Sequence, residues 1–310
     1  MGKWLAGRNA RYVEKHKTDE CQSSKSFINL QAVTKYHRNK RWQENWFWKT
    51  GKKSYYQSMY GTTKKCEDMN YIILFSALLP VAILIYYIWY RDKNSPEPAM
   101  MLVKAFFWGV LSAPLSFCLS VPFGWIGLYS NEPTTILGAI GVSFFGAAIP
   151  EEIAKFVMLW LVLRKNRYFD EKMDGIVYAV CVSLGFAALE NIMYLFSNAE
   201  SFVSVGIVRA LFSVPGHFCF GILMGYYYSL AKFYPKSPLR NKILVLVAPI
   251  IVHGLYDSIL FVGNVTPAFG GILLMLFLVF CHEMWKYGSR RIEEHLKRDE
   301  QDRVLDEESV

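Results

Sequence analysis

The sequence lacks the compact motifs by which most soluble hydrolases and nucleotide-binding proteins are recognised. It contains no H-E-x-x-H, no G-x-S-x-G and no P-loop, motifs that position zinc ligands, a nucleophilic serine or a phosphate group. Its six cysteines include no C-x-x-C pair, so neither a zinc ribbon nor a dithiol redox motif is supported.

Charged residues are also scarce over most of the chain from Tyr71 onward, where long apolar runs follow one another. The runs cover residues 71–90, 102–122, 135–163, 175–197, 204–230, 243–262 and 267–285. About 20 helical residues cross the hydrocarbon core of a membrane, and a soluble helical protein rarely needs so many such runs. The sequence therefore predicts an all-α fold, a polytopic transmembrane helical bundle of about seven spans.

The basic residues are unevenly distributed and divide the chain into three parts. Residues 1–70 contain fifteen Lys or Arg and six Asp or Glu, a net charge of +9 (15 − 6). This basic N-terminal extension is expected to rest on the anionic headgroups of the lipid bilayer or to be a solvated segment; no nucleic-acid partner is expected. Residues 71–285 form the transmembrane domain. Residues 286–310 form a polar C-terminal tail, expected to be a short solvated helix.

The loops predict how a multi-pass protein of the cell membrane is oriented. Several Lys and Arg occur in the segments 164–172 and 232–242 and in the tail, whereas residues 123–135 and 263–267 contain none. Short basic loops stay in the cytoplasm, so the C-terminus is expected to be cytoplasmic. Seven spans then place the basic N-terminal extension outside, and a miscounted span is the alternative.

A small set of ionisable residues lies inside the apolar runs, where a charge costs roughly 2.5–3.5 kcal/mol. The set consists of Glu151, Glu152, Lys155, Glu190, Arg209, His217, His253 and Asp257. These residues occur on four separate runs, the third to the sixth. Because such groups are usually retained for a function, we expect them to converge on one interior site.

The third run contains a proline followed by two adjacent glutamates. Pro150 is expected to kink or restart the helix, which leaves Glu151 and Glu152 in a first turn near free backbone N–H groups. Lys155 shares their helix face and can neutralise one carboxylate. The other carboxylate is then free to act as a general base. The plain alternative is a helix N-terminus stabilised by an ion pair.

The next three runs carry Glu190 with Asn191, then His217, then His253 with Asp257. Asp257 lies one helical turn after His253 and can orient its imidazole. Taken alone, a membrane histidine is more often a packed, hydrogen-bonded residue. Together, glutamates and histidines suit either activation of water by zinc or general-base activation without a metal, and the residues leave that choice open.

This order of motifs resembles the PrsW family of intramembrane proteases, distant relatives of the CAAX prenyl endopeptidases. The resemblance extends from about Pro80 to Trp285. It rests on the loop Tyr90–Pro98, on Glu151-Glu152-x-x-Lys155, on Phe186-x-x-x-Glu190-Asn191, on Pro215-Gly216-His217 and on His253-x-x-x-Asp257. Each piece is weak alone, whereas all of them in this order make a specific match.

The resemblance implies an intramembrane endopeptidase that cleaves a membrane-anchored protein, the family's best-known type of substrate being an anti-sigma factor. By analogy, one of the paired glutamates activates water, and Glu190, His217 and His253 hold a metal, with zinc as the candidate, or stabilise the oxyanion. The candidate catalytic residues are Glu151, Glu152, Glu190, His217 and His253, and the supporting residues are Lys155, Asn191 and Asp257.

Two other classes of function keep buried ionisable residues. A catalytically inactive membrane scaffold or chaperone of the same fold would retain the helices, although the intact set of glutamates and histidines argues against it. A cation-coupled transporter also needs buried carboxylates, but the inverted repeats typical of many transporters are not visible in the sequence. The intramembrane endopeptidase is therefore the leading hypothesis.

Overall fold

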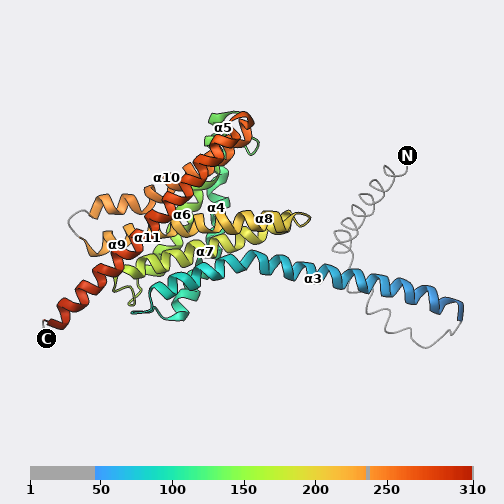
Figure 1. Cartoon of the computed structure of the whole chain (residues 1–310), viewed down its shortest axis with the longest axis horizontal. Helices are drawn as coiled ribbons and strands as arrows, with labels where there is room; N and C mark the ends of the chain where they lie inside the picture. The colour runs from blue at the N-terminus through green and yellow to red at the C-terminus, as the bar shows by residue number, and fades with distance from the viewer. Residues whose placement is uncertain (1–45, 235–237, 309–310) are drawn as a thin grey trace. The chain divides into compact units, whose positions relative to one another are not determined.

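The computed structural model describes residues 46–234 and 238–308 (Figure 1). Within these ranges every regular element is a helix, and seven helices are long and apolar enough to cross a membrane. The predicted all-α, seven-span architecture is thereby confirmed. The first 45 residues, which make up most of the predicted basic extension, lie outside the described residues.

The elements follow one another in the order α3 (Trp46–Arg91), α4 (Ala99–Trp125), α5 (Ile136–Gly141), η1 (Val142–Ala148), α6 (Ile149–Leu163), α7 (Lys172–Ser197), α8 (Phe202–Val208), η2 (Arg209–Ser213), α9 (Val214–Phe233), α10 (Pro238–Val265), η3 (Pro267–Phe269) and α11 (Gly270–Glu308). The candidate spans are Asp68–Arg91, Ala99–Trp125, Ile136–Leu163, Lys172–Ser197, Phe202–Phe233, Leu239–Val265 and Pro267–Leu305. Each of them contains most of one apolar run predicted from the sequence.

Helix α7 lies at the centre of the bundle. Of its most apolar window, 78% is buried, against 6% for the last span. It packs against α4 on one side and α9 on the other, and Figure 1 shows α7 and α9 side by side. Glycines permit these contacts: a Cβ on Gly185 would lie 2.1 Å from the Phe106 carbonyl oxygen, and one on Gly225 would lie 2.3 Å from that of Gly175. Small residues at such crossings let membrane helices approach closely.

The third and fifth spans are each interrupted by a π-helical segment. Segment η1 ends just before Pro150, and η2 ends just before Pro215. Proline has no N–H and its ring displaces the carbonyl four residues earlier, so the preceding turn widens to the longer π spacing. The break predicted at Pro150 is thus a π-helical segment that continues directly into α6. A second π-helical segment, η2, precedes α9 in the same way.

The C-terminal tail differs from the expected short solvated helix. Helix α11 continues without interruption from the last span to Glu308 (Figure 1), and one of its faces buries Ile292, His295 and Asp299. The Asp299 carboxylate accepts hydrogen bonds from the backbone N–H groups of Lys172 and Met173, at 2.9 and 2.8 Å. The first N–H groups of a helix have no partner inside it, so Asp299 satisfies two of them at the start of α7.

Replacing Asp299 with Ala should therefore destabilise the bundle. The loss of two bonds to a buried helix N-terminus and of the Lys172 ion pair should cost about 1–3 kcal/mol. Thermal unfolding of the purified protein in detergent measures this cost. Glu293→Ala, an exposed position on the same helix, is the matched control. Equal unfolding temperatures for the two variants would contradict the capping role.

The loop between α3 and α4 is fixed by buried acids. Glu97 accepts a hydrogen bond from the Tyr178 hydroxyl of α7, and Asp92 is almost fully buried beside it. Burial and the neighbouring Glu97 carboxylate raise the pKa of Asp92 from 3.8 to about 8. Burial likewise raises the pKa of Glu97. The folded protein therefore holds on Asp92 a proton that the unfolded chain has lost at neutral pH.

This difference predicts a pH dependence of stability. A group whose pKa is raised in the folded state stabilises that state at low pH. For Asp92 this stabilisation is lost as the pH rises from 3.8 to about 8. The thermal unfolding temperature should fall over this window in the parent protein. In Asp92→Asn, which cannot titrate, the fall should be smaller. The exposed Glu132→Gln should behave as the parent protein does, and a parallel pH profile for Asp92→Asn would refute the assignment.

Candidate active site

The ionisable residues of the third to sixth spans meet in one continuous hydrogen-bonded network. It starts at Asp257 of α10 and ends at Asn191 of α7. Between them lie His253, Glu152, Lys155, His217, Glu190 and Arg209, with Glu151 as a side branch. Residues up to about a hundred positions apart are brought together, as expected from the cost of isolated charges in a membrane.

Helix α6 supplies the centre of the network. Lys155 Nζ lies 2.8 Å from Glu152 Oε1 and 3.4 Å from Glu151 Oε2. Both glutamates occupy the first turn of α6, directly after the π-helical segment η1. The ammonium also lies 4.2 Å from the centroid of the Phe186 ring. Lys155 therefore binds both carboxylates from a position shielded from solvent.

Helix α10 contributes an imidazole held between two carboxylates. His253 Nδ1 lies 2.8 Å from Glu152 Oε1, and its Nε2 lies 3.3 Å from Asp257 Oδ2. The Phe220 ring of α9 stacks on the imidazole, with centroids 4.5 Å apart. The plane of His253 is thus fixed from three directions.

Helices α7 and α9 close the network on its other side. Lys155 Nζ lies 3.1 Å from His217 Nδ1, and His217 Nε2 lies 2.9 Å from Glu190 Oε2. Because an ammonium can only donate, Nδ1 of His217 accepts, and its Nε2 carries the hydrogen that it donates to Glu190. Arg209 of η2 donates to the same Glu190 oxygen at 2.7 Å.

Asn191 ties this end of the network to the first span. Its side-chain oxygen accepts a hydrogen bond from Arg209 Nε, and its side-chain nitrogen donates to the Ala77 carbonyl at 3.0 Å. An amide both accepts and donates, so Asn191 suits this bridging position. Glu190 and Asn191 therefore both direct polar groups toward other helices of the bundle.

The network has a fully buried side and a partly exposed side. The side chains of Glu152 and Lys155 are 0% and 1% exposed, whereas those of Glu151, Glu190 and Asp257 are 15–18% exposed. The two adjacent glutamates thus differ sharply. Glu152 is enclosed and held by two short contacts. Glu151 is accessible and held by one long contact to Lys155.

The donor set fits a divalent metal ion. Glu152 Oε2 is buried and has no hydrogen-bond partner in the described part of the chain, which is unusual for a carboxylate. Glu151, Glu152 and His253 offer ligand atoms that lie within 4.8 Å of one another. Catalytic zinc takes three such protein ligands and keeps a fourth position for water.

This grouping differs from the triad expected from the sequence. Glu190, His217 and His253 do not come together as one set of ligands among the described residues. Glu190 is instead engaged by Arg209 and by His217, and the other nitrogen of His217 faces Lys155.

Three side chains of the site were not among the catalytic and supporting residues expected from the sequence. Arg209 pairs with Glu190, Phe186 lies against Lys155 and His217, and Phe220 stacks on His253. Spacing carried a signal for the aromatic pair: Phe186 and Phe220 each lie within one helical turn of Glu190 and His217, respectively. Their aromatic character is common in membrane spans, so spacing alone did not distinguish them.

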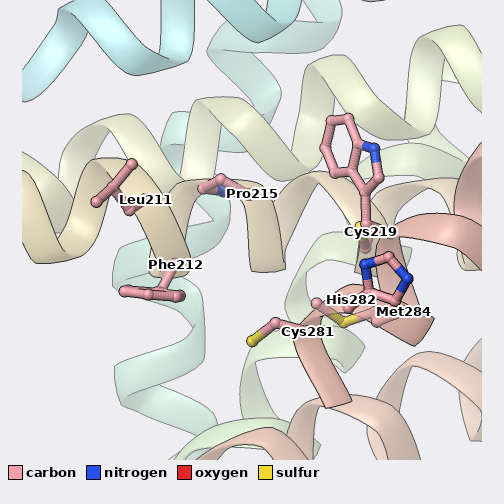
Figure 2. A pocket seen from close by; sticks show the side chains of 8 residues that line it. Leu211, Phe212, Pro215, Cys219, Cys281, His282 and Met284 are labelled. Carbon is pink, nitrogen blue, oxygen red and sulfur yellow. The ribbon is translucent and has the colours of Figure 1, made fainter. Parts of the chain in front are cut away.

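An apolar cavity of about 310 Å³ lies beside the turns that carry His217 (Figure 2). It is lined by Leu211, Phe212, Pro215, Cys219, Cys281, His282, Met284 and Trp285. The cavity is bounded by η2 and α9 on one side and α11 on the other. His282 belongs to its wall and not to the hydrogen-bonded network.

The buried acid–histidine network on apolar spans defines a multi-pass membrane protein with a hydrolase-type site. A family model described as PrsW family intramembrane metalloprotease matches residues 97–282, a segment that contains the whole network except its bond to Ala77. The chain belongs to this family and is an intramembrane protease.

Curated relatives agree with the family match. Protease PrsW of Clostridioides difficile (strain 630) is 32% identical over 223 residues, which cover 71% of this chain and 90% of the relative. Protease PrsW of Bacillus subtilis (strain 168) is 34% identical over 223 residues, 71% of this chain and 94% of the relative. Protease PrsW of Oceanobacillus iheyensis is 34% identical over 192 residues, 61% of this chain and 82% of the relative. No solved structure matches the chain significantly.

The ion pair at the centre of the network predicts an asymmetric response to mutation. Removing one partner of a buried pair leaves an uncompensated charge and costs about 3–5 kcal/mol, whereas removing both can cost less. Lys155→Met and Glu152→Gln should each lower the thermal unfolding temperature more than the same kinds of substitution do in a control pair on α11. That control, Lys286 with Glu283, has the same spacing but is exposed at 3.7 Å, and its loss should be nearly neutral.

The combined variant Glu152→Gln/Lys155→Met completes a double-mutant cycle. Its destabilisation should be clearly smaller than the sum of the two single losses, because the network then lacks a charge of each sign. Strict additivity would show that the 2.8 Å contact contributes no coupling energy.

Proposed function

We propose that this network hydrolyses a peptide bond of a membrane-anchored protein, with Glu151 taking the proton of the attacking water. The supporting observation is the contrast within the glutamate pair: Glu151 is partly exposed with one contact of 3.4 Å, while Glu152 is enclosed. A general base must be reachable by water and free to accept a proton. Both glutamates, Glu190 and the two histidines remain the candidate catalytic set.

The other residues position and stabilise charge. Glu152 holds Lys155 and His253 in place, and Asp257 orients the His253 ring through Nε2. The cations Lys155 and Arg209 lie on the two sides of His217 and Glu190, where they can stabilise the negative charge that develops on a carbonyl oxygen. Burial strengthens this stabilisation because the site has a low dielectric.

A zinc ion, when bound, would be held by Glu151, Glu152 and His253, and would acidify its bound water and polarise the substrate carbonyl. Asp257 would then act as the carboxylate that fixes the ligating histidine. With zinc bound, Glu151 would therefore act as a ligand, and it acts as the free general base in the metal-free mechanism. The proposed substrate is a single-span protein, for which the family resemblance suggests an anti-sigma factor. We also propose a cytoplasmic C-terminus, from the basic loops 164–172 and 232–242.

Glu151→Gln should reduce cleavage of a single-span substrate in proteoliposomes by about 10²–10⁴-fold, because the base is lost while the fold is kept. Asp257→Asn should reduce cleavage by roughly 10–100-fold. Glu283→Gln replaces an exposed carboxylate on α11 and should leave activity unchanged. Unfolding temperatures should confirm that all three variants fold. Full activity in Glu151→Gln, or in Glu151→Gln/Glu152→Gln, would eliminate the proposal.

The same assay separates the two mechanisms. Chelator treatment, with residual zinc measured by elemental analysis, should abolish cleavage in the metal-dependent case, and added zinc should restore it. In that case Glu152→Gln and His253→Ala should also lower the zinc content of the purified protein. Cleavage that persists after verified removal of metal would establish the glutamate mechanism.

A further inference from the structure

A second cavity, of about 590 Å³, lies where the ends of α6, α9 and α10 meet. Its apolar part includes Phe156 and Trp160 of α6 and Tyr228 of α9. The volume is within the 300–1,000 Å³ of typical ligand sites. It is separate from the Glu/His network and takes no part in the proposed reaction.

Four cations line the same cavity: Arg164, Lys165, Lys232 and Lys242. Lys232 donates to the Phe169 carbonyl. For the other three, the described residues provide no carboxylate at ion-pair distance, and the Arg164 guanidinium lies 4.9 Å from the Trp160 ring centroid. A cavity with three cations lacking a counter-ion suits an anion.

Helix dipoles alone do not account for these cations. Arg164 and Lys232 lie at the C-terminal ends of α6 and α9, where positive side chains are favoured. Lys242 lies beyond the first turn of α10, where the dipole does not favour a cation. Together with Arg164 and Lys165 it gives the cavity a positive potential that favours an anion.

The position of the cavity indicates which anion. It lies at the ends of three membrane-crossing helices, where lipid headgroups are the most abundant anions. Basic pockets between membrane helices bind acidic headgroups. We propose that this cavity binds an anionic phospholipid, with its phosphate among Arg164, Lys165 and Lys242 and its apolar part against Phe156, Trp160 and Tyr228. An inorganic anion would use the cations but not the apolar wall.

A lipid in this cavity bridges two helices of the active site. Helix α6 carries Glu152, and Phe156 directly follows Lys155, while α10 carries His253. These helices are joined inside the network by the 2.8 Å contact between Glu152 and His253. The lipid adds a second connection at their ends, so its binding should stabilise the folded protein.

The test uses the full-length protein in nanodiscs of phosphatidylcholine, with or without phosphatidylglycerol, and native mass spectrometry of the released protein. The parent should retain phosphatidylglycerol and unfold at a higher temperature when it is present. Arg164→Gln/Lys165→Gln/Lys242→Gln should weaken retention by roughly fivefold per cation, on the order of 100-fold in all. Lys286→Gln/Arg290→Gln/Lys297→Gln makes the same charge change at exposed positions of α11 and should retain the lipid.

Three outcomes would overturn the proposal. The first is equal retention of phosphatidylglycerol by the pocket variant and the parent. The second concerns the unfolding temperature of the pocket variant. If it falls below that of the parent by the same amount in pure phosphatidylcholine as in nanodiscs with phosphatidylglycerol, the cations act in folding alone. The third is equal stabilisation by inorganic phosphate added to detergent-solubilised protein, which would identify a soluble anion as the ligand.

Discussion

The contact between Lys155 and Glu152 is the interaction on which the interior of this bundle depends. Isolated, either charge would be very costly in a space closed to water. Together they satisfy one another at 2.8 Å, and each then reaches a second helix: Lys155 contacts His217 of α9, and Glu152 contacts His253 of α10. Three spans are thus joined through one ion pair, in an environment where apolar contact alone discriminates poorly between helix arrangements.

The two proline-terminated π-helical segments place this interaction. Segments η1 and η2 precede α6 and α9, so the glutamate pair and His217 each begin a new helix within a span. The first turn of α6, which carries both glutamates, therefore lies inside the bundle.

Much of the architecture could be predicted because the physics of a membrane is restrictive. Apolar length specifies spans, and the cost of buried charge predicts that Glu152, Glu190 and His253 meet. Which of these side chains contact one another could not be predicted in the same way. Helical spacing places Lys155 beside both glutamates but does not determine that Glu152 becomes enclosed and Glu151 stays accessible. That difference depends on α10, which brings His253 to Glu152 from a hundred residues away.

The C-terminal tail illustrates a second limit of prediction from the sequence. The mixed charges after residue 285 look like a solvated helix, because the sequence alone does not reveal a free helix N-terminus elsewhere in the fold. The start of α7 supplies that N-terminus, and Asp299 satisfies it. A residue that caps or contacts another helix, as Asp299 does, cannot be recognised from the pattern of its own segment. The same reasoning applies to the glutamate pair: the two residues are adjacent and chemically alike, and only contacts with distant helices enclose Glu152 and leave Glu151 partly exposed.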